Sequence, residues 1–161
     1  MPGTAKGRKI AILTDDGANA ADITQMQAAL KSAGATSEVI APHLGTLQNT
    51  SGGQVQINQR LMDVASVLYD AVYIPGGANA INAMKTNGDY IHFVQEAFKH
   101  YKPIAGSGEA STLLNAALSQ QGAAAAGVFS GQSGSAVTDN FIKAIGQHRV
   151  WDRPEAEAIP A

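Results

Sequence analysis

Short apolar runs alternate along this sequence with longer amphipathic segments, and this alternation restricts the chain to a few folds. The predicted strands lie at 8–14, 36–41, 71–75 and 103–106, and the one at 36–41 is apolar only in its second half. Segments with helical spacing of apolar residues lie between or after them, at 19–33, 80–85, 89–101, 109–118 and 135–148. Strands separated by helices predict a mostly parallel sheet that is covered on both faces. Because crossovers between parallel strands are right-handed, we expect an α/β fold, a flavodoxin-like three-layer αβα sandwich.

The segment from 44 to 59 interrupts this alternation. Turn-forming residues punctuate short alternating stretches there, namely Gly45, Asn49, Ser51, Gly52 and Gly53. This pattern is typical of a β-hairpin, so we expect a small hairpin insertion in the sandwich.

The domain itself is expected to span residues 8–149. Residues 1–7 contain two glycines and a proline and are expected to form a flexible lead-in. Residues 150–161 carry Pro154 and Pro160, so we expect an irregular C-terminal tail.

Composition excludes several classes of partner. Of the 161 residues, 45% are hydrophobic and 15% are charged, which is typical of one globular domain. The net charge is −2 and no basic cluster stands out, so we expect no nucleic-acid partner. No apolar run approaches the ~20 residues of a membrane span, and the start lacks the apolar region of an export signal. We therefore expect no membrane partner and, by default, a cytoplasmic location.

Cysteine is absent, which removes disulfides, thiolate metal sites and cysteine nucleophiles. The four histidines, at 43, 92, 100 and 148, do not have the spacing of metal ligands. We therefore expect neither a metal nor a cofactor in this chain.

Three segments are expected to meet beyond the carboxyl ends of the strands, where parallel sheets bind ligands. They are 15–22, 75–78 and 106–109. The third has the layout of a nucleophile elbow, with Ser107 at the tip between two glycines. The backbone N–H groups of Gly77 and Gly108 are candidate oxyanion donors, with Gly76 beside them.

A serine nucleophile also needs a base within hydrogen-bond reach, and no histidine is convincingly placed to serve. Asp22 and Glu109 are expected to face the pocket, but a carboxylate alone is a poor base for a hydroxyl. Two interpretations of Ser107 therefore stay open: a weak nucleophile, or a small residue that fits a tight turn. Glu109 is either a pocket acid or a first-turn carboxylate favoured by the helix dipole, and Asp22 is either a pocket acid or a solvated residue.

The residues of three strands and their loops resemble the class I glutamine-amidotransferase-like superfamily, which includes the ThiJ/PfpI-type proteins. They are Lys9-Ile-Ala-Ile-Leu with Asp16-Gly17, Tyr69-Asp-Ala-Val-Tyr-Ile-Pro-Gly-Gly77, and Lys102-Pro-Ile-Ala-Gly with Leu114. Three further stretches resemble the C-terminal domain of large-subunit haem catalases. They are Val39-Ile-Ala-Pro-His-Leu-Gly45, the stretch from Asp89 to Pro103, and His148-Arg-Val-Trp-Asp-Arg153.

The resemblance implies a pocket that has lost its catalytic groups. Active members of the superfamily have a cysteine where this chain has Ser107, a small residue where it has Glu109, and a glutamate where it has Asp22. Many also have a histidine after the fourth strand, and 122–130 contains none. The resemblance therefore implies no enzymatic activity in isolation, and it places the haem and the decomposition of hydrogen peroxide in an upstream domain.

For the domain itself, the resemblance implies two roles: stabilising the parent tetramer, and acting as a chaperone that keeps unfolding client proteins from aggregating. A chaperone needs exposed apolar surface. Candidate client-binding residues lie in the hairpin and the tail: Leu44, Leu47, Val55, Ile57, Val150 and Trp151. The alternatives are a weak hydrolase or glyoxalase-like enzyme that uses Ser107, and a purely structural module that binds no clients.

Overall fold

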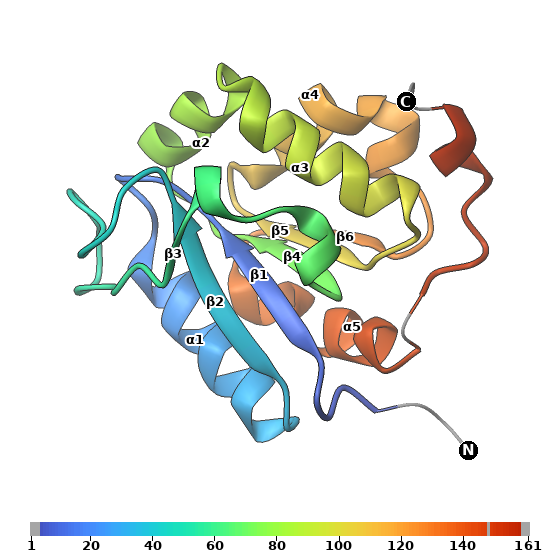
Figure 1. Cartoon of the computed structure of the whole chain (residues 1–161), viewed down its shortest axis with the longest axis horizontal. Coiled ribbons are helices and arrows are strands. Elements are labelled where there is room, and N and C mark those ends of the chain that lie inside the picture. Colours follow the sequence, from blue (N-terminus) through green and yellow to red (C-terminus); the bar gives the residue numbers. More distant parts are fainter. Residues whose placement is uncertain (1–3, 148, 159–161) are drawn as a thin grey trace.

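A six-stranded sheet forms the middle of the structure, a computed structural model that describes residues 4–147 and 149–158 (Figure 1). The strand order is β3-β2-β1-β4-β5-β6, and every pair of neighbouring strands in the sheet is parallel. The strands are β1 (Lys9–Leu13), β2 (Thr36–Ala41), β3 (Gln59–Arg60), β4 (Ala71–Ile74), β5 (Ile104–Ser107) and β6 (Val128–Gly131).

Helices cover both faces of the sheet (Figure 1). One face carries α1 (Ala20–Ser32) and α5 (Gly134–Gly146). The other carries α2 (Ala78–Lys85), α3 (Gly88–Lys99) and α4 (Ala110–Ala123). The expected αβα sandwich is therefore confirmed.

Alternation along β1 explains why two hydrophobic cores form. Ile10 and Ile12 belong to the cluster under α1 and α5, whereas Ala11 and Leu13 belong to the cluster under α2, α3 and α4. Successive side chains of a strand point to opposite faces, so one apolar strand supplies both cores. No helix of the described residues is long and apolar enough to cross a membrane.

Two strands were not predicted from the sequence. β6 is four residues long and only partly buried, and β3 has two residues. Both lie at edges of the sheet, where a strand needs little apolar sequence and is defined by pairing with its neighbour.

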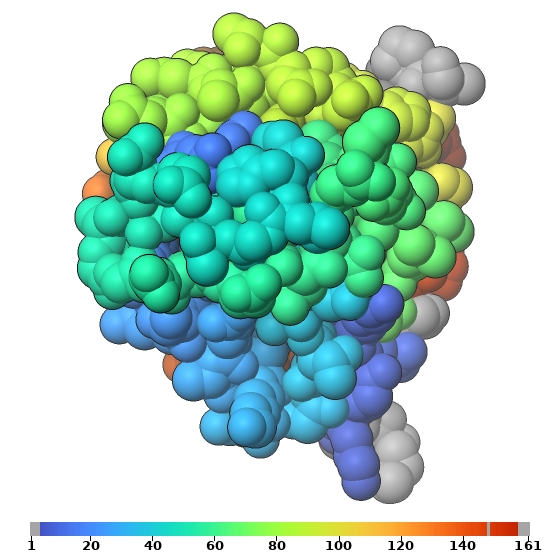
Figure 2. All heavy atoms as spheres, turned by 60° about the vertical axis from the view of Figure 1, so that its left-hand side comes forward, coloured from blue at the N-terminus to red at the C-terminus, as the bar shows by residue number. Residues whose placement is uncertain are grey.

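The segment between β2 and β3 folds back on itself. Thr46 and Gln56 form an antiparallel bridge, and the Leu47 N–H donates to the Val55 carbonyl at 3.0 Å. The segment also bonds to the loop after β1, because the Gly17 N–H donates to the Gln48 carbonyl at 2.8 Å. Figure 2 shows it, in cyan and green-cyan, lying above the blue α1. It therefore covers the first loop of the expected pocket.

Both ends of the domain pack on its body. Residues 1–3 of the expected flexible lead-in lie outside the described residues, but Ala5 is buried and the Gly7 N–H donates to the Gly34 carbonyl at 2.9 Å. The tail differs from the irregular one expected, since a 3-10 helix, η3, spans Pro154–Ala158. A proline is tolerated in the first turn of a helix, because the N–H that it lacks would be unpaired there. Residues 159–161 lie outside the described residues.

The tail is anchored by Arg153, which is fully buried. Its Nε donates to the Ala126 carbonyl at 2.9 Å and its Nη1 to the Phe98 carbonyl at 3.1 Å. The guanidinium also lies 4.6 Å from the centroid of the Phe98 ring. Burial lowers the pKa of Arg153 to about 10.

Candidate functional site at the carboxyl ends of the strands

The carboxyl ends of β1, β4 and β5 lie together as expected of a parallel sheet, and Asp22, near the start of α1, contacts both Gly76 after β4 and Ser107 at the end of β5. Asp22 Oδ2 accepts hydrogen bonds from the Gly76 N–H at 3.0 Å and from Ser107 Oγ at 2.8 Å. Asp22 reaches this position because Asn19 caps α1, its side chain accepting from the N–H groups of Ala21 and Asp22.

The Asp22 carboxylate is almost entirely buried, with 4% of the residue exposed. Its second oxygen, Oδ1, accepts from the Gly134 N–H at 3.0 Å, at the first residue of α5. Three donors and the amino end of a helix therefore stabilise the buried negative charge. The carboxylate joins α1, the end of β4, β5 and α5, so Asp22 is not the solvated residue of the simpler interpretation.

Ser107 is fully buried at the end of β5. Its Oγ also lies 2.7 Å from the Tyr73 hydroxyl. A carboxylate only accepts, so Ser107 donates to Asp22 and Tyr73 donates to Ser107. Burial raises the pKa of Tyr73, which keeps its hydroxyl proton in place as the donor. The serine hydroxyl is thus enclosed and fully hydrogen-bonded.

Both candidate oxyanion donors are also engaged. The Gly77 N–H donates to Glu109 Oε1 at 2.9 Å, and the Gly108 N–H donates to the Gly131 carbonyl at 2.8 Å. Glu109 is exposed to solvent, and the hydrogen bond from the Gly77 N–H lowers the pKa of its carboxyl group. An acidic side chain therefore occupies the donor that a substrate oxyanion would need.

Two loops approach each other so closely at residue 77 that the position requires glycine. The φ of Gly77 is +126°, and a Cβ there would lie 2.5 Å from the Gly17 carbonyl oxygen and 2.8 Å from Ala18 Cα. The neighbouring Gly76 carbonyl accepts from the Asn19 N–H at 2.8 Å. The loops after β1 and β4 thus meet at a position that only glycine fits.

Histidines of the described residues have other partners. His43 Nε2 lies 2.9 Å from Asp16 Oδ1, and its Nδ1 lies 2.8 Å from the Leu44 carbonyl oxygen. His92 and His100 lie on or next to α3, where both approach Glu96, at 3.7 and 3.5 Å. His148 lies outside the described residues. Within the described chain, no group of three or more histidine, aspartate or glutamate side chains is arranged to hold a metal.

Sequence reasoning missed Tyr73 and Gly134 as members of this cluster. Tyr73 is a polar-tipped residue inside an apolar strand, and a buried tyrosine hydroxyl usually needs a partner. The sequence therefore indicated that Tyr73 needs a hydrogen-bond partner, but not which one. Nothing in the sequence indicated Gly134, because its role depends on one backbone N–H.

Residues 6–155 match the family model described as the C-terminal domain found in long catalases. The chain belongs to this family. It is similar to Catalase HPII of Pseudomonas aeruginosa, with 36% identity over 162 residues that cover 100% of this chain and 22% of that protein. Catalase-2 of Bacillus subtilis is 34% identical over 151 residues, which cover 93% of this chain and 21% of that protein. The chain thus spans about one fifth of the length of these relatives.

Among solved structures, the fold resembles a two-domain protein of Anabaena variabilis that contains DJ-1/ThiJ/PfpI-like and ferritin-like domains. The TM-score is 0.63 with 24% identity, over 70% of this chain and 34% of that one. This likeness agrees with the fold class expected from the sequence.

The structure corrects the exposure expected of four residues in this catalase domain. Leu47, Val55 and Ile57 are at most 4% exposed, and Val150 is 9% exposed. The three hairpin residues pack into the core under α1 and α5, because the hairpin folds over the first loop with its apolar side inward. Of the candidate client residues, Leu44 and Trp151 are exposed, at 59% and 73%.

Three exposed apolar residues were missed altogether. Met62, Val67 and Leu68 belong to a stretch that contains two 3-10 helices, η1 (Leu61–Asp63) and η2 (Ser66–Leu68). The sequence there has no periodicity that distinguishes a buried from an exposed apolar residue.

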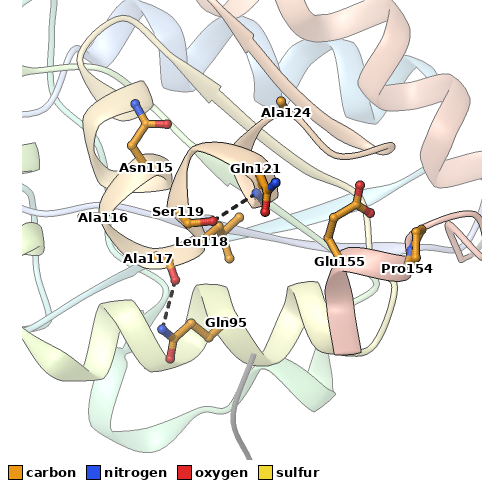
Figure 3. A pocket seen from close by; sticks show the side chains of 11 residues that line it. Gln95, Asn115, Ala116, Ala117, Leu118, Ser119, Gln121, Ala124, Pro154 and Glu155 are labelled. Atoms are coloured by element: carbon orange, nitrogen blue, oxygen red, sulfur yellow. Dashed lines mark hydrogen bonds between the residues drawn. The ribbon is translucent and has the colours of Figure 1, made fainter. Parts of the chain in front are cut away.

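A cavity of about 810 Å³ lies apart from the Asp22 cluster, between α3, α4 and η3 (Figure 3). The helix α4 is interrupted beside it at Ser119, whose φ of +66° and ψ of 172° are not helical. Gln95 Nε2 donates to the Ala117 carbonyl at 3.0 Å, next to this interruption. Glu155 Oε2 in the wall is buried with no hydrogen-bond partner. The helix expected at 109–118 ends one residue before this break, but the sequence predicted neither the helical residues after the break nor the cavity beside them.

Proposed function

We propose that this domain is a non-catalytic module that stabilises the assembly of a large catalase. The observation that carries the non-catalytic part of the proposal is the enclosure of Ser107, whose hydroxyl is fully buried and hydrogen-bonded to Asp22 and Tyr73. A hydrolytic nucleophile must reach its substrate and must lose its proton to a base. Ser107 has no solvent access, and its hydroxyl donates only to Asp22, a carboxylate that is by itself a poor base for a serine hydroxyl.

The weak-hydrolase alternative also lacks a second requirement, a free oxyanion hole. An oxyanion hole needs N–H groups that point at open space. Here the Gly77 N–H is bonded to Glu109 and the Gly108 N–H to Gly131. Hydrolysis would therefore require two hydrogen bonds to break together, the one from the Gly77 N–H to Glu109 and the one from the Gly108 N–H to Gly131.

The relatives supply the context of the proposal. They carry the name catalase, and this chain corresponds to about one fifth of their length. In our proposal a haem-bearing domain upstream of this one decomposes hydrogen peroxide, and the present domain contributes stability and no reacting group.

The test compares a complete large catalase that carries this domain with the same protein ending before residue 6. We expect the shortened protein to lose peroxide-decomposing activity at a lower temperature, with the same initial activity per haem. Equal thermal inactivation of the two proteins would contradict the proposal. A loss of activity per haem at low temperature would contradict the non-catalytic role.

A second candidate function, protection of unfolding proteins, draws support from the exposed Leu44 and Trp151. The experiment is light scattering of a heat-denatured client with the domain, with an inert protein, and with the Leu44→Ser and Trp151→Ser variants. Suppression by the domain that weakens in either variant would support this function. No suppression at stoichiometric amounts would leave the purely structural module as the better description.

A further inference from the structure

Four of the five large apolar side chains that are exposed among the described residues lie in two neighbouring segments. They are Met62, Val67 and Leu68 of the η1–η2 stretch, with Trp151 of the tail. Their exposed fractions run from 53% to 77%. We call these four residues the apolar patch. The fifth such residue, Leu44, belongs to the segment that covers the first loop.

Two surface hollows are lined in part by Met62, Val67 and Trp151 of the patch. Val67 and Trp151 line the same cavity of about 330 Å³, together with Tyr101 and Lys102, which follow the carboxyl end of α3. Met62 lines a second cavity of about 370 Å³, between η1 and α3. The patch therefore offers protruding apolar side chains next to hollows, which is how the core of a protein–protein interface is built.

The patch is held in place by the domain itself. Lys102 is 2% exposed, and its Nζ donates to the Ser66 carbonyl at 2.6 Å, which fixes η2 against the end of α3. The Trp151 ring lies 5.5 Å from the Tyr101 ring, centroid to centroid. A surface that is already ordered loses little entropy when a partner binds, and tryptophan is frequent among residues that dominate binding energy.

The Leu68 end of the patch lies near the start of the domain. The family match begins at residue 6, three residues before β1. Lys9, the first residue of β1, is bonded to Asp70 in both directions: its N–H donates to Asp70 Oδ2 at 2.8 Å, and the Asp70 N–H donates to its carbonyl at 2.7 Å. Asp70 follows the exposed Leu68 by two residues. The start of β1 and the Leu68 end of the patch are therefore neighbours.

We propose that the apolar patch is the face on which this domain packs against the preceding part of the same large catalase chain. This inference rests on the proposed function and adds the surface. Because the preceding part belongs to the same chain, its binding to the patch is intramolecular, and an interface of modest area can keep the two together. Met62 and Trp151 belong to residue types that are enriched in such interfaces.

Carbene footprinting tests this surface directly, since carbenes label side chains in proportion to their exposure. The isolated domain and the complete catalase are labelled in parallel. The isolated domain is expected to fold because its own helices cover both faces of its sheet, and circular dichroism verifies this. We expect labelling of Met62, Val67 and Trp151 to fall, in the complete catalase, to the level of the buried Leu47. Labelling of Leu44 should not change. Equal labelling of the patch in both proteins would overturn the inference.

A pair of substitutions in the complete catalase provides the second measurement. Val67→Asp places a charge on the patch, and Leu44→Asp is the matched change at an exposed residue outside it. We expect Val67→Asp to reproduce most of the loss of thermal stability caused by removing the domain, and Leu44→Asp to cause none. Equal effects of the two substitutions would overturn the inference. Unchanged melting of the isolated Val67→Asp domain verifies that the substitution acts on the interface.

The two proposals fail in different ways. If removal of the domain leaves thermal inactivation unchanged, the proposed function is wrong. If removal destabilises the catalase while the patch stays fully labelled, the function stands and the choice of surface is wrong.

Discussion

Ser107 donates a hydrogen bond of 2.8 Å to the buried carboxylate of Asp22, at the position where an elbow nucleophile would be expected. The relationship is structural: the serine supplies one of the three donors that stabilise a charge enclosed among four elements of the fold. The residue whose position suggested catalysis thus stabilises the carboxyl end of the sheet.

Replacing Ser107 with alanine should destabilise the domain without changing any activity. Asp22 would lose one donor and the Tyr73 hydroxyl its acceptor, both in a buried site. A buried polar group left without its partner costs about 1–3 kcal/mol. Urea unfolding measures the loss, with Ser32→Ala, at the exposed end of α1, as the control. A Ser107→Ala domain as stable as the wild type would show that this hydrogen bond does not contribute to the free energy of unfolding.

Replacing Gly77 with alanine should be much more damaging than the same change at Gly88. The new Cβ at residue 77 would lie 2.5 Å from the Gly17 carbonyl oxygen, at a φ of +126°. At Gly88, the first residue of α3, an added Cβ would meet no atom within 4 Å. We expect Gly77→Ala to cost more than about 2 kcal/mol and Gly88→Ala to stay within about 1 kcal/mol of the wild type. Denaturant midpoints of both variants decide this, and similar midpoints would contradict the tight contact of the two loops.

Strand and helix patterns predicted most of this fold because they depend on local sequence. β1, β4 and β5 are apolar runs buried between helices, and the second half of β2 is buried as well. A continuous apolar run predicts a strand with both faces covered. The edge strand β6 escaped prediction because Val128–Gly131 is only partly buried and its pairing with β5 is a tertiary property.

The candidate site could be predicted only as far as topology determines it. Asp22, Gly76 and Ser107 meet because parallel strands bring their carboxyl ends to one edge. The hydrogen bond from Tyr73 to Ser107 depends on the direction of the tyrosine side chain, and the one from the Gly134 N–H to Asp22 depends on the position of α5. Residue spacing along the chain predicts neither. The hairpin shows the same limit: its alternating stretches and turn residues predicted a hairpin, but not that Leu47, Val55 and Ile57 point inward.

The carboxyl group of Glu109 should stabilise the domain near neutral pH and cease to do so in acid. The hydrogen bond from the Gly77 N–H lowers its pKa from the ordinary value of 4.5. A lowered pKa means that the stabilisation is present above 4.5 and is lost as the pH falls through the lower value found in the folded protein. Because Glu109 is exposed, we expect less than about 1 kcal/mol. The difference in unfolding free energy between wild type and Glu109→Gln, followed against pH, measures it, and a difference that grows in acid would contradict the assignment.

His43 should hold the segment between β2 and β3, which covers the loop after β1, most firmly when its ring is protonated. Both of its nitrogens face acceptors, the Leu44 carbonyl at 2.8 Å and Asp16 Oδ1 at 2.9 Å, and only the imidazolium can donate to both. The hydrogen bond to the Leu44 carbonyl and then the one to Asp16 raise the pKa of His43 above 6.5. A raised pKa means that the stabilisation is complete below 6.5 and is lost as the pH rises through the folded-state value.

Two measurements check this behaviour. The imidazole proton resonance of His43 should titrate above 6.5 in the wild type and at a lower pH in Asp16→Asn, which removes the negative charge but keeps a side chain of similar size. Hydrogen exchange of the amides in 46–57 should quicken over the same pH range beyond the intrinsic increase of the rate, and this excess should be absent in His43→Gln. A midpoint at or below 6.5 in the wild type would show that the imidazolium does not join the covering segment to the loop after β1, since the two acceptors would then give no preference for the charged ring.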